Sequence, residues 1–162
     1  AGMEDPGEAE DKWSPTINIG TSVLIPESYV ADLTLRMELY RRIAVQETAQ
    51  EIDAFAVELV DRFGTMPEEV SHLLEVMTIK QYCRQANIEK VDAGAKGAVL
   101  TFRNNSFDNP GGLVAYISKQ PGSAKLRGDH KMVYTRSWAH PEDRLRGVHT
   151  LAKDLAKIAM AP

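Results

Sequence analysis

The clearest structural signals of this chain lie in Thr48-Ala-Gln-Glu-Ile-Asp-Ala-Phe-Ala-Val-Glu-Leu-Val-Asp-Arg-Phe-Gly-Thr-Met-Pro67. Thr48 and Glu51 have the spacing of a capping box, in which the two side chains bond to backbone amides at the start of a helix. Gly64 suits the left-handed conformation that commonly ends one. The stretch therefore predicts a helix that begins at Thr48 and ends at Phe63.

The predicted helix has two distinct faces. Its apolar residues fall within an arc of about 100°, the width expected of a face packed on a core; they are Ile52, Phe55, Ala56, Leu59 and Phe63. At about 100° per residue a row of acids spans about 80°, centred roughly 135° from the apolar stripe. This acidic row consists of Glu47, Glu51, Glu58 and Asp61.

The acidic row has two interpretations. It can be a solvated face, which is the commonest reason for such a row on a helix. It can also be a docking surface for arginines, whose planar guanidinium groups pair strongly with carboxylates once water is excluded. Like charges three or four residues apart are mildly unfavourable in an isolated helix, so the row gains most if a basic partner meets it.

Helices are also expected on both sides of this stretch. Before it, Asp32 can cap a helix that runs to about Ala44. The apolar stripe expected on that helix is formed by Leu33, Met37, Tyr40 and Ile43 or Ala44. After it, Thr65 and Glu68 repeat the capping-box spacing at the start of a third helix, and Asn87 suits its left-handed end.

The remaining elements are short strands in hairpins and two more helices. They are a bent strand or extended arm over 16–25, a hairpin over 88–102, a short helix from Asp108 or Asn109, a hairpin over 125–134 and a last helix from Pro141 to about Ala159. The order strand, three helices, hairpin, helix, hairpin, helix predicts an α+β fold. We expect a small mixed, mostly antiparallel sheet packed by about five helices.

The chain length and its first residues indicate the domain organisation. A chain of 162 residues fits one domain. Residues 1–12 are acidic and contain no large apolar side chain except Met3, so they cannot repay the entropy of ordering. The sequence predicts a flexible acidic linker over 1–12 and a single domain over 13–162.

Composition narrows the environment and the class of partner. The single cysteine, Cys83, excludes an internal disulfide framework and suits a reducing compartment, so we expect a cytoplasmic protein. No apolar run reaches the ~18 residues of a membrane span. The net charge of −4 argues against nucleic-acid contact. We interpret Arg41-Arg42, the only adjacent Arg/Lys pair, as a solvated last helical turn.

Motifs for chemistry are absent from the sequence. No nucleotide-binding loop, nucleophile elbow or zinc helix occurs, and His72 is interpreted as a surface or boundary histidine. We therefore expect no catalytic residue, no cofactor and no metal ion. A basic groove, or a deep pocket lined by His130, His140 and nearby acids, would instead favour a small enzyme or a nucleic-acid-binding domain.

Several segments resemble one known family. They include Ile25-Pro-Glu-Ser-Tyr-Val-Ala-Asp32, Leu39-Tyr-Arg-Arg-Ile-Ala44, Val57-Glu-Leu-Val-Asp-Arg-Phe-Gly64 and Ile88-Glu-Lys-Val91. These segments resemble the C-terminal (TRCF) domain of the bacterial transcription-repair coupling factors, Mfd. The likeness runs from about Trp13 to the C-terminus, and after Phe107 it concerns layout more than particular residues.

The resemblance implies a regulatory role without chemistry in this domain. Such coupling factors are ATP-driven DNA translocases that displace stalled RNA polymerase and recruit the excision-repair protein UvrA. Their C-terminal domain packs on the UvrB-like N-terminal module and masks the surface that binds UvrA. Glu58 and Asp61 match the family's acidic docking face, with Glu47 and Glu51 as an extension of it. The alternative is a general interaction module that uses the same face for a separate basic partner.

Overall fold

The computed structural model describes residues 13–120 and 122–161, so the predicted linker over 1–12 lies outside the described residues. In chain order the elements are β1 (Thr16–Asn18), α2 (Leu33–Ala44), α3 (Ala49–Phe63), α4 (Glu68–Gln85), β2 (Ile88–Gly94), β3 (Gly97–Phe102), the 3-10 turn η1 (Arg103–Asn105), α5 (Pro110–Ser118), β4 (Ala124–Leu126), β5 (Met132–Thr135) and α6 (Pro141–Met160). This order confirms the predicted α+β class.

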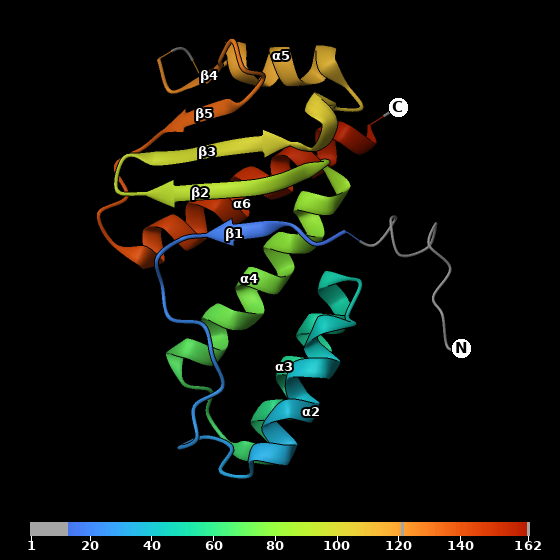
Figure 1. Cartoon of the computed structure of the whole chain (residues 1–162), viewed down its shortest axis with the longest axis vertical. Helices are drawn as coiled ribbons and strands as arrows, with labels where there is room; N and C mark the ends of the chain where they lie inside the picture. Colours follow the sequence, from blue (N-terminus) through green and yellow to red (C-terminus); the bar gives the residue numbers. More distant parts are fainter. Residues whose placement is uncertain (1–12, 121, 162) are drawn as a thin grey trace.

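The strands form one sheet in the order β1-β2-β3-β5-β4 (Figure 1). β1 is parallel to β2, and the other neighbouring pairs are antiparallel. Both expected hairpins are present, and the first closes through the short turn between Gly94 and Gly97. The prediction of a mixed, mostly antiparallel sheet is confirmed.

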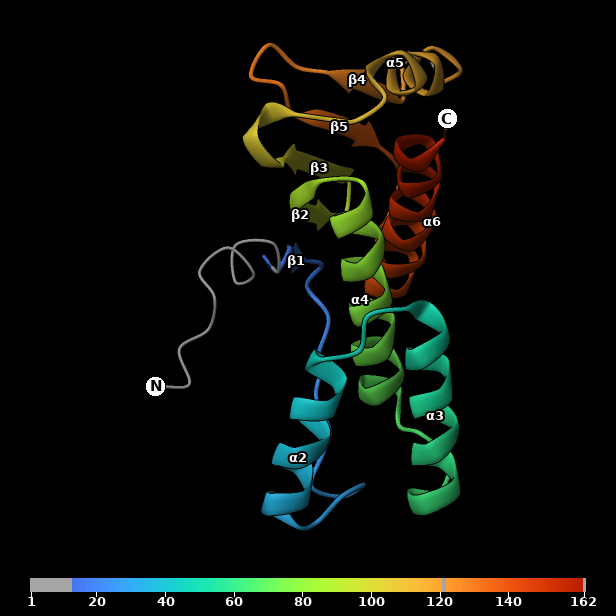
Figure 2. The same ribbon diagram turned by 90° about the vertical axis from the view of Figure 1, so that its right-hand side faces the viewer.

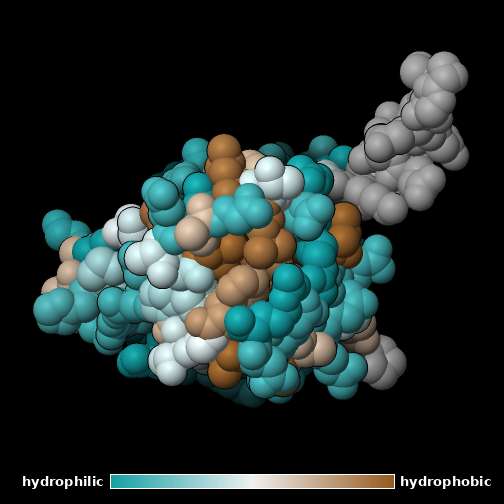
Figure 3. Space-filling model, turned by 90° about the horizontal axis from the view of Figure 1, so that it is seen from below, coloured by the Kyte–Doolittle hydropathy of each residue, from teal (hydrophilic) through white to brown (hydrophobic). Residues whose placement is uncertain are grey.

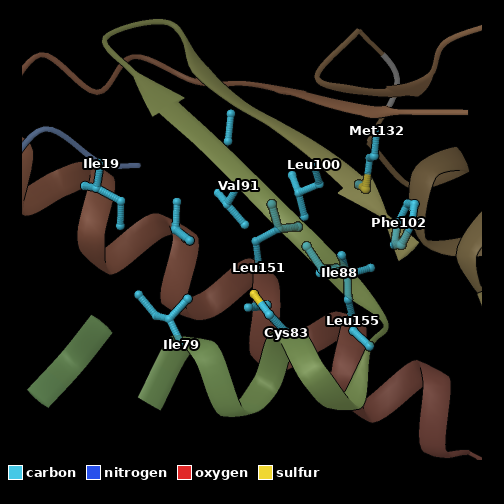
Figure 4. Close-up of a cluster of buried hydrophobic side chains, with 14 of the residues drawn as sticks. Ile19, Ile79, Cys83, Ile88, Val91, Leu100, Phe102, Met132, Leu151 and Leu155 are labelled. Atoms are coloured by element: carbon cyan, nitrogen blue, oxygen red, sulfur yellow. The ribbon is translucent and has the colours of Figure 1, made fainter. Parts of the chain in front are cut away.

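Helices α4 and α6 cover the same side of the sheet (Figure 2). Their inner residues pack with strand residues in one cluster, here called the upper core (Figure 4). Its fully buried members include Ile79, Cys83, Ile88, Val91, Leu100, Met132, Leu151 and Leu155. The buried residues of α6 recur at helical spacing and include Leu145, Val148, Leu151, Ala152 and Leu155, so one face of the helix packs on the sheet.

A second apolar cluster lies below the sheet, between α2, α3 and the first half of α4. This lower core consists of Ile25, Val30, Leu39, Ile43, Ile52, Phe55, Leu59, Val70 and Leu74. Helix α4 belongs to both clusters, since Val70 and Leu74 pack in the lower core while Ile79 and Cys83 pack in the upper core. The two cores are therefore joined through one continuous helix.

The segment between β1 and α2 is an extended arm, one of the two forms expected for it. It runs down beside the helices (Figure 1), with Ile19 buried in the upper core and Ile25 in the lower core. The Tyr40 hydroxyl accepts a hydrogen bond from the Ile25 amide at 2.7 Å. The arm thus spans both clusters, as α4 does.

The stripe predicted for α2 is partly wrong. Ile43 is buried, but Leu33 and Met37 are 61% and 40% exposed, and the fully buried residue is Leu39. The helix offers two apolar stripes with different angles, and periodicity alone does not choose between them. The lower core selects the stripe that contains Leu39.

The capping box predicted at Thr65 is also wrong, because α4 begins after Pro67 and has no side-chain cap. A cap at Thr65 would require a helical Met66. The residue before a proline is disfavoured in the helical region, so the helix starts one residue later than the proline. The predicted end is confirmed, since Asn87 has φ 60°.

The two faces of α3 should differ sharply in their effect on stability. We expect Leu59→Ala, which truncates a residue with 0% exposure, to lower the free energy of unfolding by about 2–5 kcal/mol. Val57→Ala, on the same helix but 61% exposed, should change it by less than about 0.5 kcal/mol. Urea denaturation of both variants measures the difference, and equal losses would contradict the burial pattern.

Candidate functional site

Helix α3 has both of its predicted ends. The Thr48 hydroxyl accepts from the Glu51 amide at 3.1 Å, and Gly64 follows the last turn with φ 89°. The return bond differs from a standard capping box, because Glu51 Oε1 accepts from the Glu47 amide at 2.7 Å. The ends fix the helix in length, and Ile52, Phe55 and Leu59 fix its rotation against the lower core.

Glu58 is held by two arginines of its own chain. Its Oε1 accepts from Arg42 Nη2 at 2.6 Å, and its Oε2 accepts from Arg42 Nη1 at 2.6 Å and from Arg62 Nη1 at 3.0 Å. The first pair is a two-point guanidinium–carboxylate contact between α2 and α3, which is the strongest geometry for such a pair. The three residues form what we call the Arg42–Glu58–Arg62 network.

Aromatic rings pack against the two arginines of this network. The Arg42 guanidinium lies over the Phe55 ring at 4.9 Å, and that of Arg62 lies over the Phe63 ring at 5.0 Å. Both rings belong to the apolar stripe that packs on the lower core. The hydrogen bonds from Arg42, followed by those from Arg62, lower the pKa of Glu58 to about 2. Glu58 is therefore a fixed, ionised acceptor at ordinary pH.

The other acids of the predicted row have different environments. Asp61 is exposed, and the ion pairs found among the described residues do not include it. Glu51 is used at the helix start, and exposed Glu47 lines a cavity of about 660 Å³. The row is thus divided into a paired Glu58, an open Asp61 and two acids at the opposite end of the helix.

Apolar side chains accompany Asp61 on the outer face of α3. Val57 and Val60 are 61% and 44% exposed, and at helical spacing they lie within about 100° of Asp61. Viewed from below, where the lower helices end, hydrophobic side chains gather among hydrophilic ones (Figure 3). We call Val57, Glu58, Val60 and Asp61 the α3 face. An apolar centre beside charged groups is the usual composition of a protein interface.

Arg42 is the residue that the sequence interpretation missed. The sequence predicts a solvated last turn at Arg41-Arg42, but Arg42 bonds to Glu58 across the α2–α3 pair. Acidic and basic residues on adjacent antiparallel helices were the available signal. Their contact depends on how α2 is rotated about its axis. The predicted apolar stripe of α2 implied a different rotation from the observed one.

A deep pocket shared by His130 and His140 would favour a small enzyme, and a basic groove would favour a nucleic-acid binder. His130 and His140 line different cavities, of about 150 and 350 Å³. The cavity of about 660 Å³ contains Lys80 and Arg84 beside Glu47, so its charges are mixed. Protein grooves that bind nucleic acids normally carry many more Lys and Arg side chains.

One set of side chains in the described part of the chain has the composition of a metal site. Glu68, His72 and Glu142 each bring a potential ligand atom within 4.8 Å of the others. Hydrogen bonding with Glu142 raises the pKa of Glu68. The sequence predicts no metal site here, because these residues come from two helices far apart in the chain.

Within the described residues, no helix combines the length and the apolar character needed to cross a membrane.

Comparison with known proteins links the chain to one family. A model of the TRCF domain family matches residues 19–113. The transcription-repair-coupling factor of Rickettsia bellii (strain RML369-C) is 38% identical over 133 residues, which are 82% of this chain and 12% of that protein. The transcription-repair-coupling factor of Escherichia coli (strain K12) is 27% identical over 161 residues, which are 99% of this chain and 14% of that protein. The chain thus spans a small fraction of the length of these relatives.

A solved structure supports the fold. The crystal structure of the C-terminal domain of transcription-repair coupling factor has a TM-score of 0.76 and 18% sequence identity. The match covers 90% of this chain and 94% of that chain. At this identity the likeness shows a shared fold.

The Arg42–Glu58–Arg62 network predicts a specific titration. The folded pKa of Glu58, about 2, lies below the unfolded value of about 4.3, so its stabilising effect is present above pH 4.3 and lost toward pH 2. Arg42→Gln should raise the pKa of Glu58 toward 4.3 and cost at most about 1 kcal/mol at pH 7, since the pair is exposed. NMR titration of the Glu58 carboxyl carbon measures this.

Arg41→Gln is the matched control, because Arg41 is exposed and adjacent but does not bond to Glu58. An equal rise in the pKa of Glu58 in both variants would show that net charge, and not the hydrogen bonds from Arg42, sets the value.

Proposed function

The chain belongs to the TRCF domain family of transcription-repair coupling factors, and on that premise we propose that it is their C-terminal regulatory domain. The parent protein would be an ATP-hydrolysing DNA translocase that displaces stalled RNA polymerase and recruits UvrA for nucleotide excision repair. The domain itself would perform no chemistry and would need no cofactor. Its contact with UvrA and RNA polymerase would be indirect, through the parent.

The proposed partner is the UvrB-like N-terminal module of the same protein, and the contact surface is the α3 face. The observation that carries this proposal is the exposed Asp61 beside exposed Val57 and Val60. An arginine-rich partner surface would pair with Asp61 while covering the valines. Packing of this kind would mask the surface of the module that binds UvrA, which is autoinhibition.

Glu58 retains capacity for a partner despite its internal pairs. A carboxylate has about four acceptor sites, and the network uses three hydrogen bonds, one at Oε1 and two at Oε2. One site at Oε1 is left for a donor from outside. Because the arginines already hold the group in place, a partner would lose little side-chain entropy in binding it.

A modest interface suits a regulatory clamp. Coupling between sites is typically worth about 1–3 kcal/mol, which a conformational change can overcome. Tethering within one protein raises the effective concentration of the partner to the millimolar range for short flexible linkers, so weak contacts are sufficient. A small number of charged and apolar groups on one helix fits that requirement.

We expect Asp61→Arg to weaken the association of this chain with the UvrB-like module of the same organism's coupling factor by about tenfold or more, because the change converts attraction to like-charge repulsion. Isothermal titration calorimetry measures the affinity. Asp108→Arg is the control, since it makes the same change at an exposed site before α5, at the far end of the molecule.

The full-length coupling factor provides the functional measurement. Glu58→Arg combined with Asp61→Arg should raise its affinity for UvrA, while circular dichroism shows an unchanged fold. Wild-type affinity for UvrA in this double variant would refute the proposed contact between the α3 face and the UvrB-like module. Binding of the domain to other basic proteins, without binding to the UvrB-like module, would support the general interaction module.

A further inference from the structure

A separate site lies where the first turns of α4 and α6 meet. Glu68 is the first residue of α4, His72 lies one turn later, and Glu142 is the second residue of α6. Their ligand atoms lie within 4.8 Å of one another. They line a cavity of about 350 Å³ together with Thr21, Ser22, Glu69, His140 and Pro141. No residue of the α3 face contributes to it.

Each acid alone has an ordinary explanation. Carboxylates in the first turn of a helix are stabilised by the helix dipole. That effect does not explain why carboxylates from two different helices converge on one imidazole. Two like charges at this separation repel unless a proton or a cation lies between them. The convergence of all three groups, and not the acidity of either helix start, is the feature that a bound cation would explain.

The orientation of His72 fits metal coordination. Its Nδ1 lies 3.3 Å from the Thr21 hydroxyl, and its Nε2 faces Glu68 Oε1 at 3.9 Å. Metal-binding histidines commonly donate their second ring N–H to a neighbouring acceptor, which fixes the ring and the tautomer. Thr21 can accept this bond, leaving Nε2 as the ligand. The His72 side chain is 15% exposed, so the ring is held by packing as well.

We propose that Glu68, His72 and Glu142 bind a divalent first-row transition ion such as Zn²⁺. Two carboxylates balance its charge, and the imidazole selects it over Mg²⁺ and Ca²⁺, which prefer oxygen ligands alone. Three protein ligands leave at least one position for water. The side chains of exposed Glu68 and Glu142 need only a small shift to close on the ion. The bound ion links α4 to α6 at their first turns.

The test is titration of the chain with Zn²⁺ by calorimetry. We expect saturable binding of one ion per chain, and at least a tenfold loss of affinity in His72→Ala and in Glu142→Gln, since each removes a ligand. Co²⁺ provides a second readout, because its visible absorption reports ligation by these groups. Glu142 is exposed, so Glu142→Gln should fold even where His72→Ala does not.

His130→Asn is the matched control. His130 is exposed on the β4–β5 turn with φ 65°, a conformation that asparagine tolerates, and it lines a different cavity. Its loss should leave Zn²⁺ affinity unchanged. Absence of saturable binding, equal effects of the His72 and His130 variants, or tighter binding of Mg²⁺ than of Zn²⁺ would each overturn the proposal.

Discussion

The structure depends on the burial of one helix, α4, by two different groups of neighbours. Val70 and Leu74 pack with α2 and α3, whereas Ile79 and Cys83 pack with the sheet and α6. At about 1.5 Å per residue the 18 residues of α4 extend ~27 Å. A helix of this length can reach both cores without a break, so the lower helices are anchored to the sheet although their direct contacts with it are few.

The arm between β1 and α2 adds a second connection of the same kind. Ile19 packs in the upper core and Ile25 in the lower core, and the Tyr40 hydroxyl bonds the arm to α2. With two connections in place, α3 needs only its inner stripe to hold the fold. Val57, Val60 and Asp61 are therefore not required for packing of the core, and these positions are available for contact with a partner.

The predictions from sequence succeeded where signals were local. The ends and inner face of α3 are encoded by Thr48, Gly64 and the spacing of Ile52, Phe55 and Leu59, all within one element. The rotation of α2 depended on packing with other elements, so its stripe was misassigned. The same error hid Arg42 as the partner of Glu58.

The candidate sites show the same limit more strongly. Glu58 and Asp61 were selected from a row of acids and a family resemblance, but only the packed helices reveal that one is paired and the other open. The cluster of Glu68, His72 and Glu142 joins residues separated by about 70 positions. Nothing in local periodicity connects them, because the α4–α6 crossing brings them together.

The pairing of Glu58 changes what the α3 face can contribute to an interface. An unpaired carboxylate would lose its water shell when buried, and that cost offsets much of the attraction to a partner. Glu58 has already exchanged part of its water for Arg42 and Arg62, and those arginines place positive charge beside it. Long-range attraction of a basic partner therefore rests on Asp61, while Glu58 provides a directed acceptor. Such a division gives orientation and selectivity with modest affinity, which is what a releasable contact requires.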